Sequence, residues 1–247
     1  MNNKNVALST TKLKREKKIK RIIKIALLLL LLLLVILYMV IGIIYNNSNF
    51  SITLDRNLYY DKGIIVYDDP EYKVFRSELF AVSPDTFDNI SYRWLPEDIN
   101  ESKGGSHNGK NYLAYTFYVE NMGYDIADYY SEITIDDVIK NVDEAVRIRV
   151  YRNGEATTYA KKSSTDEAEK NTVPFKEDDL IALEHVEEFK PGDIDKYTVV
   201  LWLEGSDPEC NDNILGGEIK MTMNFNSERI NEVEKEGNYE NKKQKKN

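Results

Sequence analysis

The sequence contains a single cysteine, Cys210, among its 247 residues, so no disulfide can form within one chain. Small secreted domains that depend on several disulfides are thereby excluded, and the fold must rest on a hydrophobic core. Histidine is almost as scarce, since His107 and His185 are the only two, and no His-Glu-x-x-His motif is present. The zinc hydrolases that carry this motif are therefore excluded as well.

Charge is absent from residues 25–45 and is distributed unevenly on either side of them. Residues 1–24 hold nine basic side chains and one acidic side chain, a net charge of +8. Residues 46–247 hold 24 basic and 41 acidic side chains, a net charge of −17. A strongly basic end indicates a membrane or a nucleic acid as partner. The uncharged segment that follows decides for the lipid bilayer, and we expect no nucleic-acid partner.

The uncharged segment 25–45 includes eight consecutive leucines, Leu27–Leu34. A helix of these 21 residues is about 31 Å long, close to the ~30 Å hydrocarbon core of a bilayer. We therefore predict one transmembrane helix over residues 25–45. By the positive-inside rule, the basic residues before it keep residues 1–24 in the cytoplasm and place the rest of the chain outside the cell.

A cleaved signal peptide is the alternative for this segment. The apolar region of a signal peptide is typically about 7–15 residues long and ends in small residues at the cleavage site. Here the apolar region is longer, and Ile43–Ser48 offers no Ala-x-Ala pattern. The sequence favours an uncleaved anchor and a single-pass protein of the cell membrane.

Residues 46–226 have the pattern of one β domain. Val146, Ile148 and Val150 alternate with arginines, which is typical of a half-buried strand, and Asn153-Gly154 is the favoured pair for a two-residue hairpin turn. Further strand-like runs recur between turn signals at 50–54, 63–67, 72–82, 112–120, 129–135, 156–160, 197–203 and 219–225. The sequence predicts a mainly β fold, a β-sandwich or jelly roll, in which only Asp136–Glu144 resembles a short helix.

Two of these predicted strands differ in how apolar their faces are. Both faces of 197–203 are apolar, so we expect a central strand with Trp202 in the core. The strand 219–225 has one apolar face, so we expect it near a sheet edge or with a solvated outer face. The remaining segments are polar, and we expect a short link at 46–49, long loops at 97–110 and 161–173, and a disordered charged tail at 227–247.

Three short segments, at Tyr115–Gly123, Asp143–Arg147 and Phe189–Asp193, carry a resemblance to known proteins. They resemble the camelysin and TasA-like surface proteins of Gram-positive bacteria, and membrane-anchored relatives of that family are also similar over Tyr197–Cys210 and Gly216–Met221. The resemblance covers residues 50–226 and implies an extracellular jelly-roll domain. Some proteins of that family are subunits of matrix fibres. Those subunits are released by signal cleavage, whereas this chain is predicted to stay anchored.

A cysteine enzyme is the most specific catalytic hypothesis that the sequence allows. A transpeptidase of the sortase type would need Cys210, either His107 or His185, and Arg229. The cysteine follows Asp207 and Glu209, and acidic neighbours raise the pKa of a thiol, whereas a nucleophilic cysteine needs a positive environment. We therefore predict a structural role for Cys210 and no catalytic residues.

The loop 204–213 is rich in oxygen ligands. Asp207, Glu209 and Asp212 lie within six positions, and hard carboxylate ligands at this density suit Ca²⁺. The spacing does not match an EF-hand loop. A charged turn at the end of a strand is the alternative to a calcium site.

These observations lead to three functional hypotheses. The first is a membrane-anchored extracellular module that binds a cell-envelope component or a protein partner without catalysing a reaction. The second is a structural surface subunit that assembles with copies of itself, and the third is an envelope enzyme.

Overall fold

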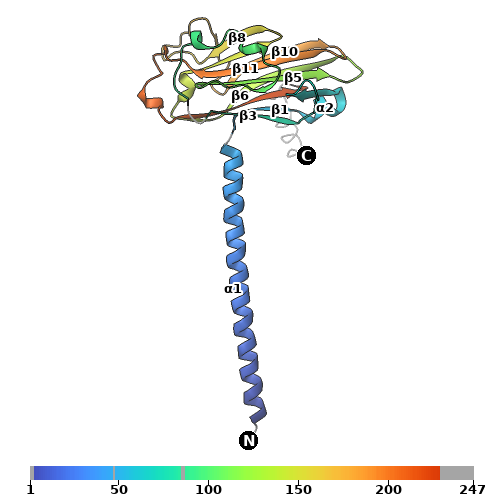
Figure 1. Ribbon diagram of the computed structural model, residues 1–247, viewed down its shortest axis with the longest axis vertical. Coiled ribbons are helices and arrows are strands. Elements are labelled where there is room, and N and C mark those ends of the chain that lie inside the picture. Colours follow the sequence, from blue (N-terminus) through green and yellow to red (C-terminus); the bar gives the residue numbers. More distant parts are fainter. Residues whose placement is uncertain (1–2, 47, 85–86, 229–247) are drawn as a thin grey trace, which may run out of the picture. The chain divides into compact units, whose positions relative to one another are not determined.

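The computed structural model describes residues 3–46, 48–84 and 87–228 (Figure 1). The chain divides between Asn47 and Ser48 into two compact units. The first unit contains one helix and the second contains two β-sheets.

Helix α1 spans Asn3–Asn46 and is longer than the predicted transmembrane segment. The basic residues before the apolar run are lysines and arginines, which are good helix formers, so the helix extends through them. Within it, the segment Arg15–Val40 is long and apolar enough to cross a membrane, and none of this segment is buried by protein. The predicted link at 46–49 is wrong, because β1 already begins at Ser48.

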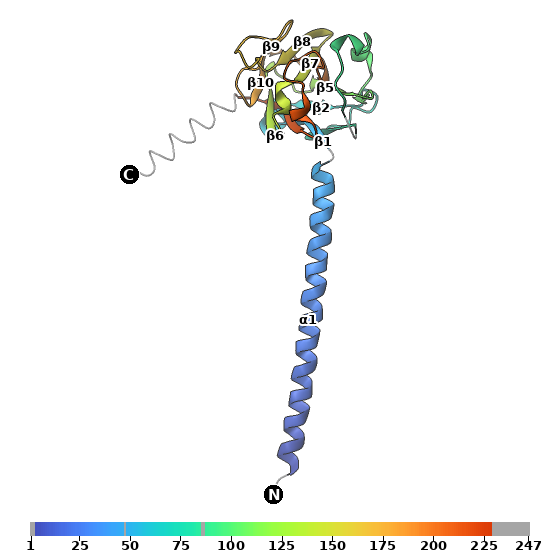
Figure 2. The same ribbon diagram turned by 90° about the vertical axis from the view of Figure 1, so that its left-hand side faces the viewer.

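The second unit consists of two mainly antiparallel sheets (Figure 2). The first sheet has the order β10 (Leu180–Phe189), β6 (Ala127–Ile139), β12 (Glu218–Asn226), β1 (Ser48–Leu54) and β3 (Glu78–Val82). The second has the order β2 (Ile64–Tyr67), β5 (Tyr112–Asn121), β11 (Ile194–Leu203), β7 (Val146–Arg152), β8 (Glu155–Ala160) and β9 (Val173–Pro174), with β4 (Gly105–Ser106) beside β5. Among the strands of the described residues, only the pairs β1–β12 and β8–β9 are parallel.

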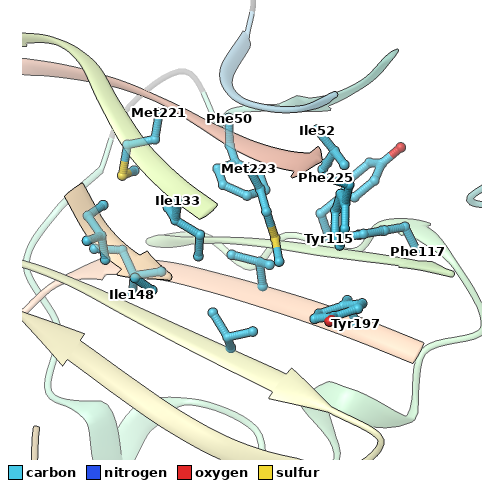
Figure 3. Packing of buried hydrophobic residues seen from close by; sticks show 14 of the residues in the cluster. Phe50, Ile52, Tyr115, Phe117, Ile133, Ile148, Tyr197, Met221, Met223 and Phe225 are labelled. Carbon is cyan, nitrogen blue, oxygen red and sulfur yellow. The ribbon is translucent and has the colours of Figure 1, made fainter. Parts of the chain in front are cut away.

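The two sheets pack face to face around one hydrophobic core (Figure 3). Aromatic rings from both sheets meet there. The Phe225 ring of β12 lies 5.8 Å from the ring of Phe117 on β5 and 5.5 Å from the ring of Tyr197 on β11, measured between centroids. All three side chains are fully buried, so the contact joins the middle strands of the two sheets.

Strand β11 lies between β5 and β7 and is buried on both faces, as predicted. Val199 and Leu201 face the main core, while Val200 and Trp202 lie in a second apolar cluster on the opposite face. The segment 87–111 covers this outer face through buried side chains, which are Ile90, Leu95 and Ile99. The prediction that Trp202 belongs to a core is confirmed, since it is 2% exposed.

Strand β12 is central in the first sheet and has a solvated outer face. Its inward side chains are buried, as the alternation predicted: Ile219, Met221, Met223 and Phe225. Its outward side is polar, and Thr222 Oγ1 lies 2.9 Å from Ser51 Oγ of β1. Of the two alternatives, the solvated outer face is therefore correct and the edge position is wrong.

Short helical segments connect the strands. They are α2 (Arg56–Lys62) and the 3₁₀ turns η1 (Tyr92–Trp94), η2 (Ile99–Glu101), η3 (Val142–Glu144) and η4 (Asp212–Ile214). Helix α2 ends at Gly63 with a φ of 73°, where an added Cβ would lie 2.5 Å from the Cα of Gly123. Glycine is required at this position because two backbone segments meet there.

Two further predictions of local structure are wrong. The helix predicted at Asp136–Glu144 is mostly strand, because β6 continues to Ile139 and pairs Val138 with Ile219 of β12. Only the single turn η3 is helical. In the run predicted over 72–82, the strand begins only at Glu78, because residues 69–73 form a turn in which the Lys73 N–H donates to the Asp69 carbonyl.

The aromatic contact between the sheets leads to a prediction about stability. Phe225→Ala should lower the free energy of unfolding by about 3–5 kcal/mol, because it removes a fully buried ring and leaves a cavity. Phe80→Ala makes the same chemical change on β3, where the ring is 52% exposed, and should cost less than about 1 kcal/mol. Urea unfolding of the two variants measures the difference, and equal losses would contradict the assignment of Phe225 to the core between the sheets.

Candidate functional site

The predicted calcium ligands lie in the loop that follows β11. Asp207 is buried, and its Oδ1 accepts a hydrogen bond from the Glu209 N–H at 2.8 Å. Asp212 lies farther along in η4, where it is exposed. The loop therefore brings Asp207 and Glu209 together and leaves Asp212 outside the cluster.

A buried arginine is the main partner of Asp207. Arg147 lies on the outward face of β7 and is 4% exposed. Its guanidinium donates to Asp207 Oδ2 and forms a second ion pair with Glu169 at 3.3 Å. A buried guanidinium must be paired, because desolvation of an unpaired charge costs several kcal/mol. These ion pairs attach the loops 161–172 and 204–211 to β7.

Three carboxylates converge around this arginine. One oxygen each of Glu169, Asp207 and Glu209 lies within 4.8 Å of the others. Burial raises the pKa of Asp207 and the side chain of Glu209 raises it further, whereas the Glu209 N–H and the Arg147 guanidinium lower it. The side chain of Asp207 and the Ser164 N–H lower the pKa of Glu209 to about 2. The Arg147 guanidinium thus favours the ionised form of Asp207, which is the form that their ion pair requires.

The geometry favours Arg147 over calcium as the counterion of this cluster. Ca²⁺ is held by about six to eight oxygens, whereas three carboxylates converge here and two of them already pair with the arginine. Glu169 was missed by sequence reasoning because it lies 38 positions before Asp207, in a loop without a ligand motif. The calcium site predicted at Asp207, Glu209 and Asp212 stays a prediction. Of these three residues, Asp207 and Glu209 lie in the cluster, where Glu169 joins them.

The residues that a cysteine enzyme needs are not brought together in the described part of the chain. Cys210 is partly buried, and burial followed by the charge of Asp207 raises the pKa of its thiol. The His107 ring lies 2.9 Å from the Thr116 hydroxyl on the second sheet, while the His185 ring stacks on Tyr130 in the first sheet. Arg229 lies outside the described residues.

A buried polar network occupies one end of the core. Asp195 accepts hydrogen bonds from Tyr129, Arg152 and Asn153, and the Tyr129 and Tyr197 hydroxyl oxygens lie 3.0 Å apart. Burial raises the pKa of both tyrosines well above its usual range, so they remain protonated donors. Groups with strongly shifted pKa values can mark an active site. Here each polar group of the network has a hydrogen-bond partner within the protein, which is typical of a structural network.

A surface pocket of about 360 Å³ adjoins this network and contains two carboxylates, Glu155 and Glu184. Paired carboxylates are the requirement of a glycosidase. Glu184 accepts a hydrogen bond from the Tyr159 hydroxyl at 3.1 Å, and the Arg152 at the same pocket is paired with Asp195 at 3.0 Å. These structural contacts account for Glu184 and Arg152, and they assign neither an acid nor a nucleophile.

Glu204 is an internal acceptor that fixes the covering segment to β11. Its Oε2 accepts hydrogen bonds from the Trp202 indole N–H and from the Tyr92 backbone N–H, both at 3.0 Å, and its Oε1 accepts one from the Ser206 hydroxyl at 2.7 Å. Burial by itself raises the pKa of this carboxyl, but the donors outweigh burial and the pKa is lowered overall. Sequence reasoning counted Glu204 among the acidic residues of the loop and missed this role, because its partner Tyr92 lies 112 positions away.

The chain matches no protein-family profile and no curated protein. Among solved structures it is similar to β-glucosidase from Kluyveromyces marxianus, in a complex with glucose and in a Se-Met labelled crystal. The identities are 10% and 14%, and the TM-scores are 0.25 and 0.24. The similarity covers 69% of this chain but only 16% and 17% of the β-glucosidase chains. Similarity at this level carries no argument about function.

The counterion of the acidic cluster can be tested with a variant. Arg147→Met should lower the free energy of unfolding by about 3–5 kcal/mol, because it leaves buried Asp207 without its cation. Millimolar Ca²⁺ should restore part of this loss and leave the parent chain unchanged, as measured by thermal unfolding with and without chelator. Arg56→Met, at an exposed position of α2, is the matched control. A rise in the parent's Tm that matches the rise in the variant would instead establish a calcium site beside Arg147.

The contacts of Glu204 predict a pH dependence of stability. Because its folded pKa lies below the ordinary 4.5, its carboxylate stabilises the fold above pH 4.5, and this contribution is lost as the pH falls below that value. Glu204→Gln should cost roughly 1–3 kcal/mol at pH 7, since two donors would face an amide N–H₂ or lose their acceptor. The difference from the parent should shrink as the pH falls below 4.5, whereas exposed Glu97→Gln should track the parent throughout. A constant difference over that range would mean that the charge of Glu204 is not what holds the segment.

Proposed function

We propose that this protein is a membrane-anchored extracellular module that binds a cell-envelope component or a protein partner and does not act as an enzyme. The observation that carries the proposal is a helix suited to span a membrane, followed after a single residue by a β unit with its own core. In the described part of the chain, the candidate catalytic groups are either far from one another or satisfied by structural contacts, as expected for a binding domain.

The orientation in the membrane follows from charge. The net charge of +8 on residues 1–24 supports a cytoplasmic N-terminus and an external β unit. The resemblance to camelysin and TasA-like proteins supports a jelly roll on the surface of a Gram-positive cell. Consecutive strands often alternate between the two sheets, as β1, β2 and β3 do and as β5, β6 and β7 do. This alternation also supports a jelly roll.

Self-assembly is the second candidate. Strand β3 lies at the edge of the first sheet and is short, and its outward side chains Phe80 and Val82 are 52% and 61% exposed. An apolar edge strand can pair with a strand of another chain. An uncleaved anchor would confine such assembly to neighbouring chains in the same membrane.

The proposed orientation can be tested by cysteine labelling, since Cys210→Ala leaves a chain without cysteine. In that background, Tyr124→Cys replaces a side chain that is 98% exposed in the β unit, and Lys18→Cys lies in the basic half of α1. A membrane-impermeant maleimide should label Tyr124→Cys on intact cells and Lys18→Cys only after permeabilisation. The reverse pattern would refute the orientation.

Binding and self-assembly can be separated with the detergent-solubilised full chain. Sedimentation with isolated cell-wall material, by a chain that otherwise remains a monomer, supports the binding module. A chain that stays in the supernatant and forms cross-links only between its own copies would replace that proposal by the structural subunit.

A further inference from the structure

An exposed tryptophan stands on the segment that covers the second sheet. Trp94 is 73% exposed, whereas Trp202, the other tryptophan of the chain, is 2% exposed. Burial of a tryptophan is strongly favourable, and an indole left in water contributes little to the core of its own fold. Trp94 is therefore a candidate for a role outside the hydrophobic core.

The backbone beneath this indole is fixed. The Trp94 N–H donates to the Ser91 carbonyl at 2.9 Å within η1, and the buried residues Ile90 and Leu95 flank the turn. Both backbone polar groups of Ile90 are hydrogen-bonded to the end of β11 and the residues after it. Its N–H donates to the Leu203 carbonyl and its carbonyl accepts from the Gly205 N–H, each at 2.9 Å. The indole is thus presented by a preorganised support, which lowers the entropy cost of binding.

The residue before Trp94 is an arginine whose guanidinium has unused donors. Arg93 is exposed, its Nε donates to the Tyr92 hydroxyl at 3.3 Å, and its Cζ lies 5.7 Å from the centroid of the Tyr92 ring. Among the described residues, Arg93 forms no ion pair with a carboxylate. Lys170 is near enough to Tyr92 for its charge to act on that side chain. Arg93 and Lys170 thus bring positive charge to Tyr92 in a β unit that is acidic overall, while Glu204 acts on the same side chain with the opposite sign.

The size of the apolar area limits what can bind. The other large apolar side chains of the turn and its flanks, Ile90, Leu95 and Ile99, are buried, so the exposed apolar surface is the Trp94 indole and part of Tyr92. One aromatic side chain presents roughly 150–250 Å², whereas a stable protein interface needs about 800 Å² from each partner. A single ring-sized group fits this surface better than a protein does.

We infer that Tyr92, Arg93 and Trp94 form a binding site for a saccharide that carries an anionic group. The apolar C–H face of a sugar ring packs on the Trp94 indole, while the planar donors of Arg93 bind a carboxylate or phosphate on the same or the next sugar. Exposed Glu97 and Asp98 follow within four positions and disfavour a dense polyanion, so the preferred ligand carries few charges. This inference rests on the proposed function, since it names the chemical class of the envelope component.

The chain offers a direct signal for such binding, because only one of its two tryptophans is exposed. The full chain in phosphatidylcholine nanodiscs is titrated with trigalacturonate, which carries carboxylates, and with a phosphorylated maltotriose. Neutral maltotriose and a glutamate trimer are the controls for charge and for sugar. We expect at least one anionic saccharide to bind and to shift the tryptophan emission to the blue, with calorimetry as a second measurement that does not depend on Trp94.

Variants separate the site from other surfaces. Trp94→Ala and Arg93→Gln should each weaken binding by about tenfold or more, which corresponds to about 1.4 kcal/mol, and Tyr124→Ala, an exposed aromatic far from this turn in sequence, should bind as the parent does. Equal binding of the glutamate trimer, unchanged binding by Trp94→Ala, or no binding of either anionic saccharide would each overturn the inference. A chain that sediments with cell-wall material but ignores both anionic saccharides overturns this inference alone and leaves the proposed function intact.

Discussion

Strand β11 must be covered on both faces, and the second unit is organised around this constraint. Its inward residues meet the aromatic side chains of β12, and its outward residues Val200 and Trp202 would be left in water without the segment 87–111. That segment is held by three buried apolar side chains and by the carboxylate of Glu204, which accepts from both Trp202 and Tyr92. The sheet and its cover therefore depend on each other.

The elements that the sequence predicts well are those in which one short-range pattern decides the structure. The Asn153-Gly154 turn has positive φ angles at both residues, as a type I′ turn requires, and it joins β7 to β8 in the predicted place. The alternation over 219–225 identified the buried face of β12 correctly. In both cases the signal lies within a few consecutive residues.

The sequence predictions fail where contacts between distant parts of the chain determine the structure. Val138, Ile139 and Val142 suit either a helix or a strand in so short a run, and pairing with β12 selects the strand. Strand β10 was not predicted, because Glu184, His185, Glu187 and Glu188 interrupt its apolar pattern at the edge of the first sheet. The acidic cluster was half predicted, since Asp207 and Glu209 are neighbours, but Arg147 lies 60 positions earlier in the sequence. The exposure of Trp94 has no sequence signal either, because it depends on which face of the covering segment meets β11.

The same support connects the fold to the proposed binding role. Glu204 and Ile90 fix the turn η1 to the end of β11, and this turn presents Trp94 and Arg93 to solvent. Recognition by a few exposed groups on a fixed turn requires no catalytic constellation and no large apolar interface. It suits the proposed module, whose membrane anchor would keep it near the envelope.

Hydrogen–deuterium exchange of the full chain in detergent tests the central claim, that β11 is buried on both faces by a sheet and a fixed cover. The account predicts slow exchange in peptides that cover 198–205, and protection of the Ile90 and Trp94 amides in peptides that cover 89–95, because both amides donate to carbonyls. Exchange of 89–95 as fast as an unstructured segment, together with rapid exchange on β11, would show that the cover is detached and would contradict the account.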